Sequence, residues 1–192
     1  TEDYLAPVYH RLHEELLRRE VLHADETTLQ VLHEPGKAPQ SGSYMWLYRT
    51  SGDTDKPIVL YEYQKTRNAS HPREFLKDFK GICVTDGYQV YHTIENERED
   101  LKIAGCWAHS RRRFDEAVKA LPKSSRSNSL AYLALKQIQA IYREENKLAD
   151  MTFEERLEHR QLTVKPLVDA YFTWVKENLT KVPAKGKTYN GF

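Results

Sequence analysis

The chain has 192 residues, of which 40% are hydrophobic, 30% are charged and 11% are aromatic, and its formal net charge is +1. This composition supports a packed core, and no apolar run is long enough to span a bilayer, so we expect a cytoplasmic protein with no membrane partner. The nearly balanced charge excludes a uniformly basic nucleic-acid binder, and two cysteines are too few for a disulfide framework.

The N-terminal part of the chain predicts one helix followed by three strands. Apolar residues at helical spacing mark the helix, and apolar runs between Pro, Gly and Ser turns mark the strands. The expected ranges are a helix at 2–19 and strands at 21–32, 43–49 and 57–64. Short polar connections between consecutive strands favour antiparallel pairing.

The pattern then changes to alternating helices and strands. Ser70 is a good helix cap with Pro72 in the first turn, and Gly81 ends that helix. The elements expected next are a strand at 82–85, a strand at 101–107 and a helix at 109–121, and a small helix between 88 and 97 is left open. Because crossover connections are right-handed, the fourth strand should lie parallel to the first, which becomes the central strand. We therefore expect an α/β fold with a mixed five-stranded sheet.

Beyond Pro122 the sequence predicts only helices, at about 129–149 and 153–179. Thr152 and Glu155 form a capping-box pattern, and Pro166 should break or kink the second helix. The expected division is an N-terminal helix at 1–19, a sheet-containing core at 20–122 and a helical module at 123–192.

Asp25 and Asp86 are the candidate catalytic and metal-binding residues. Each is a carboxylate in or at the end of an apolar strand, where an unpaired charge is costly, and the expected topology places them side by side. Such a pair is suited to bind Mg²⁺, which prefers oxygen ligands. The alternatives are that Asp25 only pairs with an arginine, that Glu26 is the functional acid, and that Asp86-Gly87 is an ordinary turn.

A second group of candidates follows the fifth expected strand. His109 should lie at the same sheet edge, and Arg111, Arg112 and Arg113 near a helix N-terminus are candidates for binding DNA phosphates. The alternative for the arginines is a solvated basic surface. Cys106 and His109 have the spacing of half a zinc site, but a single half-motif is weak support for one.

Four segments closely resemble the insertion sequence 66 family of bacterial transposases: Leu22–Thr27, Tyr44–Tyr48, Thr85–Tyr91 and Cys106–Phe114. The resemblance implies a ribonuclease-H-like catalytic core of the DDE type with a C-terminal helical insertion module. It also implies that Asp25 and Asp86 are the two aspartates, that Mg²⁺ or Mn²⁺ is the cofactor, and that the bacterial enzyme acts on transposon ends and target DNA as a homo-oligomer.

In this family the third acidic residue is a glutamate in an asparagine-rich motif after the helical insertion. That motif is absent from the 192 residues, so we expect the third carboxylate outside this chain and the isolated chain to be inactive. Two other functions stay open. One is a ribonuclease-H-like nuclease that uses water as the nucleophile, and the other is a non-catalytic fragment that binds DNA or sister subunits.

Overall fold

The computed structural model describes residues 2–52, 55–184 and 186–191, and these form two compact units. Unit 1 is Thr1–Cys106 and unit 2 is Trp107–Phe192. Among the described residues, no helix has the length and apolar character needed to cross a membrane.

Unit 1 contains a mixed five-stranded sheet with helices. Its elements are α1 (Glu2–Leu17), β1 (Val21–Gln30), β2 (Gly42–Thr50), β3 (Val59–Gln64), α2 (Ser70–Phe75), β4 (Gly81–Thr85), α3 (Gln89–Asn96) and β5 (Leu101–Gly105). The strand order is β3-β2-β1-β4-β5. β1 pairs antiparallel with β2 and parallel with β4, and β4 pairs parallel with β5. The expected α/β class, the central position of the first strand and the parallel fourth strand are confirmed.

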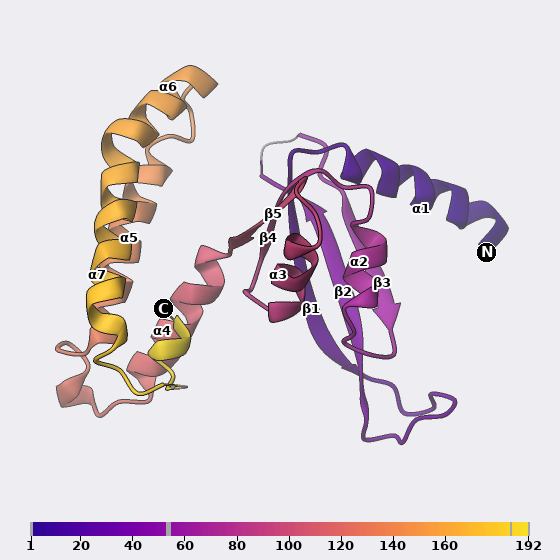
Figure 1. Ribbon diagram of the computed structural model, residues 1–192, viewed down its shortest axis with the longest axis horizontal. Coiled ribbons are helices and arrows are strands. Elements are labelled where there is room, and N and C mark those ends of the chain that lie inside the picture. The colour runs from indigo at the N-terminus through magenta and orange to yellow at the C-terminus, as the bar shows by residue number, and fades with distance from the viewer. Residues whose placement is uncertain (1, 53–54, 185, 192) are drawn as a thin grey trace. The chain divides into compact units, whose positions relative to one another are not determined.

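One face of the sheet carries the hydrophobic core of unit 1. Strand alternation directs Leu22, Ala24, Trp46 and Tyr48 to this face, where they pack against helical side chains. The Tyr48 ring stacks on that of Phe75 in α2 with the centroids 3.5 Å apart. Figure 1 shows α2 and α3 on the same side of the strands.

The opposite face of the sheet is much more open. Its residues include Asp25 of β1, Tyr61 of β3, which is 59% exposed, and Ile82 of β4, which is 43% exposed. Asp25 therefore avoids the cost of burial in the apolar core, because alternation directs it away from the face that α2 and α3 cover.

Helix α1 differs in packing from the amphipathic helix that the sequence predicts. Its apolar residues recur at helical spacing, but Leu5, Val8 and Leu12 are exposed, whereas Leu16 is buried in the core and Tyr9 and Leu17 pack against it. The C-terminal half of α1 contacts α2, because His13 Nε2 lies 3.0 Å from the carbonyl oxygen of Phe75. Hydrophobic periodicity predicted the helix but not the extent of its burial.

Unit 2 is helical. Its elements are α4 (Trp107–Lys119), a 3₁₀ turn η1 (Lys123–Ser125), α5 (Leu130–Asn146), α6 (Phe153–His159), a π-helical turn η2 (Arg160–Val164), α7 (Lys165–Leu179) and a 3₁₀ turn η3 (Tyr189–Gly191). Phe114 of α4, Ile138 of α5 and Tyr171 of α7 belong to one buried cluster. Figure 1 shows α5 and α7 running side by side.

The sequence predicts that the segment 109–121 belongs to the sheet-containing core, whereas the structure groups α4 with unit 2. The physical reason is the apolar face of α4, where Phe114 and Ala117 pack in the helical cluster. β5 ends at Gly105 and α4 begins at Trp107, so the expected strand at 101–107 is shorter and the helix starts earlier.

The expected helix at 153–179 is interrupted. The Thr152 and Glu155 capping box is present at its start. The π-helical turn η2 lies just before Pro166, and α7 begins with this proline in its first turn. The hydrogen-bond pattern therefore changes next to Pro166, but the chain stays helical through it, since proline is tolerated in the first turn of a helix, where no backbone N–H is needed.

Candidate functional site

The central strand β1 carries two adjacent carboxylates that point to opposite faces of the sheet. Leu22 and Ala24 are buried in the core, so the alternation places Glu26 on the core face and Asp25 on the opposite face. Asp25 is half-buried, and its Oδ1 accepts a hydrogen bond of 2.9 Å from the backbone N–H of Glu26. The strand therefore holds Asp25 at the edge of solvent, as a ligand or catalytic group requires.

Asp86 follows the neighbouring strand at its carboxyl end. The parallel register of β1 and β4 pairs Leu22 with Cys83 and His23 with Val84. When this register is continued by two residues, Asp25 lies opposite Asp86. Functional groups collect at this position in sheets with parallel strands, because the chain turns away there and leaves room for a ligand.

The turn after β4 fixes the Asp86 side chain. Gly87 has a φ of +85°, which favours glycine, and it allows the chain to reverse directly after Asp86. Asp86 Oδ1 accepts a hydrogen bond of 2.9 Å from the backbone N–H of Tyr88. Asp86-Gly87 is thus a turn, as the alternative interpretation had it, and the turn also orients the carboxylate.

Glu26 is the third carboxylate of the neighbourhood, and it is enclosed. Its side chain is 1% exposed and is paired with Arg67, whose Nε donates a hydrogen bond of 2.8 Å to Oε1. The hydroxyl of Tyr91 donates to Oε2 at 3.3 Å. Both oxygens of Glu26 are therefore engaged by protein groups.

The pKa of Glu26 reports on this environment. Burial raises the pKa above its ordinary value, the hydrogen bond and positive charge of Arg67 lower it in part, and the negative charges of Asp86 and Asp25 raise it further. The three carboxylates thus share one electrostatic neighbourhood, in which the Arg67 guanidinium offsets one of the negative charges.

The other predicted site residues lie in unit 2, on α4. Arg111 and Arg112 are exposed, and Arg113 Nη1 donates a hydrogen bond of 3.0 Å to the carbonyl oxygen of Asn190. Because α4 begins at Trp107, the arginines lie in the second helical turn, where the helix dipole has little effect on them. The phosphate-binding role of His109, Arg111, Arg112 and Arg113 stays a prediction.

Over the ranges that the structure describes, no group of three or more His, Cys, Asp or Glu side chains is arranged to hold a metal ion. This includes the neighbourhoods of Cys106 and His109. The role of Asp25 and Asp86 as metal ligands therefore stays a prediction.

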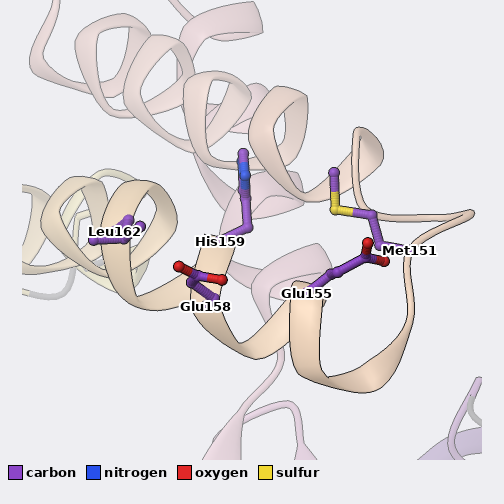
Figure 2. Close-up of a pocket in the computed structure, with 5 residues that line it drawn as sticks. All are labelled: Met151, Glu155, Glu158, His159 and Leu162. Carbon is purple, nitrogen blue, oxygen red and sulfur yellow. The ribbon is translucent and has the colours of Figure 1, made fainter.

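Unit 2 contains a pocket of about 220 Å³, which Figure 2 shows, lined by Met151, Glu155, Glu158, His159 and Leu162. Glu155 accepts a hydrogen bond from the backbone N–H of Thr152 as part of the capping box. His159 Nε2 lies 3.7 Å from Glu144 Oε2. These groups serve the helical packing, so the carboxylates of unit 1 form the better candidate site.

The sequence offers Glu26 as an alternative acid but does not indicate its partners Arg67 and Tyr91, or Tyr88, which contacts Arg67. Arg67 lies in the loop between β3 and α2, where no periodicity or motif marks it. Tyr88 and Tyr91 stand in the Thr85–Tyr91 segment, which was noted only for its aspartate. Tyr88 and Tyr91 are three residues apart, so a helix beginning near Tyr88 places both rings on the same side. This spacing was the sequence signal that could have indicated a shared contact.

Comparison with known proteins gives one family. A sequence model of the family described as "Transposase IS66 family" matches residues 1–191. The uncharacterized protein y4qI of Sinorhizobium fredii is 31% identical over 176 residues, which are 86% of this chain and 31% of that protein. The uncharacterized protein y4hP of the same organism is 27% identical over 186 residues, or 89% of this chain and 33% of that protein. The chain thus spans about a third of the length of these relatives. No solved structure matches.

Proposed function

The chain belongs to the IS66 family of transposases, and from this premise we propose that it supplies two catalytic carboxylates, Asp25 and Asp86, to a DDE-type transposase. The enzyme would cut DNA at transposon ends and join the released 3′-hydroxyl to target DNA. The observation that supports the assignment of residues is the parallel register of β1 and β4, in which His23 pairs with Val84, two residues before Asp25 and Asp86. The mixed sheet is consistent with a ribonuclease-H-like core.

The donor set fits a divalent metal ion. Asp25 and Asp86 are both half-buried, and carboxylate oxygens are the ligands that Mg²⁺ and Mn²⁺ prefer in sites that also bind phosphate. When bound, such an ion activates the attacking oxygen and stabilises the leaving oxygen in an in-line displacement. The chain's own contribution is to hold Asp25 within β1 and Asp86 directly after β4, and to keep Glu26 apart on the core face.

Two carboxylates are fewer than a complete DDE site needs, and we propose that the third comes from a part of the transposase outside this chain. The curated relatives are about three times as long as the aligned region, which leaves room for it. By the same reasoning, we propose that the whole bacterial protein binds transposon ends and target DNA and assembles as a homo-oligomer on DNA.

Within this chain, we propose that the exposed Arg111 and Arg112 contact DNA phosphates in that assembly. We also propose that the helices of unit 2 correspond to the family's insertion module.

The first test is the metal requirement of the complete transposase. Strand joining between a double-stranded transposon end and a plasmid target should fall to background in excess EDTA and recover on addition of Mg²⁺ or Mn²⁺. The reason is that the two carboxylates repel each other and cannot by themselves activate a hydroxyl for attack on phosphate. Joined products are quantified on gels, with DNA binding measured in parallel by gel shift.

Three outcomes would contradict the proposal. Joining that persists in EDTA would remove the metal-site assignment. Hydrolysis of RNA–DNA hybrids with no joining of DNA would identify a nuclease in place of a transposase. Binding of DNA without cleavage at any Mg²⁺ or Mn²⁺ concentration would support the non-catalytic alternative.

A further inference from the structure

Arg67 links the two strands that carry the candidate site. It lies in the loop between β3 and α2, and its guanidinium donates to Glu26 of β1 through both Nε and Nη2. The same guanidinium lies over the ring of Tyr88, with its carbon 3.7 Å from the ring centroid. One planar group therefore contacts the central strand on one side and the turn after β4 on the other.

Tyr88 completes the connection to Asp86. Its hydroxyl donates a hydrogen bond of 3.1 Å to the carbonyl oxygen of Arg67, so side chain and backbone of Arg67 both hold this tyrosine. The backbone N–H of Tyr88 donates to Asp86 Oδ1. Glu26, Arg67, Tyr88 and Asp86 thus form a continuous chain of contacts, which we call the Arg67 clamp.

We propose that Arg67 is a positioning residue that holds the Asp86 carboxylate in its metal-binding orientation. The inference deepens the proposed function and rests on it. A planar guanidinium is suited to this role, because it donates in a fork to a carboxylate in its plane and stacks its face on an aromatic ring at the same time. Partners that orient metal ligands from outside the coordination shell commonly change metal affinity when they are removed.

The clamp and a simple charge effect predict opposite results. Arg67 and Glu26 together are neutral, so removal of Arg67 leaves an added negative charge near Asp25 and Asp86. If Arg67 acted only through charge, its loss would strengthen the binding of a divalent cation. If it acts by positioning Asp86, its loss should weaken that binding, because the turn is no longer held.

The first measurement is made on this chain without metal. Hydrogen exchange of the Tyr88 amide, followed by NMR, reports the Tyr88–Asp86 hydrogen bond directly. Arg67→Ala should speed this exchange about tenfold or more. The matched control is Arg73→Ala, which removes the bidentate ion pair of Arg73 with Glu97 in the same unit. It should leave the exchange rate of the Tyr88 amide unchanged. Unchanged exchange in Arg67→Ala would overturn the clamp.

The second measurement is Mn²⁺ affinity by calorimetry on the same proteins. Arg67→Ala should weaken Mn²⁺ binding by about 10-fold, within the usual range for partners of metal ligands. Arg67→Lys keeps the charge but loses the planar fork and should also bind Mn²⁺ more weakly. Tighter binding in Arg67→Ala, or wild-type binding in Arg67→Lys, would overturn the inference.

Two further results distinguish a failure of the Arg67 inference from a failure of the proposed metal site. Tyr88→Leu removes the ring and hydroxyl while leaving Arg67 in place, and it should reproduce both changes even if Arg67→Ala does not fold. If the unmodified chain binds no Mn²⁺, the metal site of the proposed function fails on this chain, whereas the exchange measurement still decides whether Arg67 holds the Asp86 turn.

Discussion

In the complete transposase, Asp25→Asn and Asp86→Asn are each expected to reduce strand joining about a thousandfold or more. A bound metal ion stabilises the charge of the transition state by several kcal/mol, and each 1.36 kcal/mol is about a tenfold change in rate. Asparagine has nearly the size of aspartate but lacks the negative charge that holds a divalent cation. Loss of either charge should therefore remove most of the catalytic effect.

The two substitutions should leave the fold intact. Oδ1 of Asp25 accepts from the Glu26 N–H and Oδ1 of Asp86 accepts from the Tyr88 N–H, and the amide oxygen of asparagine can accept the same bonds. The urea unfolding midpoint and circular dichroism of each variant should match the unmodified protein. Glu97→Gln is the control, because it neutralises a half-exposed carboxylate of unit 1 that pairs with Arg73.

Glu26→Gln distinguishes the two acids of β1. Glu26 is enclosed on the core face and is held by Arg67 and Tyr91, so its neutralisation should reduce joining far less, by about tenfold, through the loosened Arg67 contact. Full activity in Asp25→Asn together with an inactive Glu26→Gln would reverse the assignment. Glu26, the alternative acid that the sequence left open, would then be the metal ligand.

The topology around Asp25 and Asp86 followed from the sequence because two strong rules apply there. Short polar turns required antiparallel neighbours for the first three strands, and a right-handed crossover required the fourth strand to lie beside the first. Both requirements are met in the sheet order β3-β2-β1-β4-β5. The catalytic role of the pair is a further step, which stays a prediction until the variants are measured.

The Arg67 clamp was not predictable in the same way. Arg67 precedes Tyr88 by 21 residues and follows Glu26 by 41, and their contacts depend on side-chain directions that no local pattern specifies. The same limit applies to α1, where spacing predicted an apolar stripe but three of its leucine and valine residues, Leu5, Val8 and Leu12, are exposed. Local rules determine elements and strand order, whereas long-range side-chain contacts depend on the assembled fold.

Gly81→Ala is expected to lower the free energy of unfolding of unit 1 by about 3 kcal/mol. Gly81 begins β4 with a φ of +144°, and a Cβ atom there would lie 2.3 Å from the carbonyl oxygen of Glu20. That oxygen accepts the hydrogen bond from the N–H of Ile82, which aligns β4 with the start of β1. An alanine therefore cannot be accommodated unless β4 moves away from β1.

The control is Gly42→Ala in β2, where nothing lies within 4 Å of the added Cβ atom. Alanine restricts the unfolded chain more than glycine does, so this change should be neutral or stabilise by up to about 1 kcal/mol. Urea unfolding monitored by circular dichroism measures both variants. A Gly81→Ala protein as stable as the control would show that β4 tolerates a shift at its first residue.

The consequence of Gly81→Ala for the site follows from its position. Asp86 directly follows the same strand, five residues after Gly81, and its position relative to Asp25 depends on the register that the Gly81 region establishes with β1. Any Gly81→Ala protein that folds should therefore bind Mn²⁺ more weakly than Gly42→Ala, although Gly81 contacts neither carboxylate. Equal Mn²⁺ affinity in the two variants would mean that the Arg67 clamp alone is sufficient to hold Asp86, independently of where β4 begins.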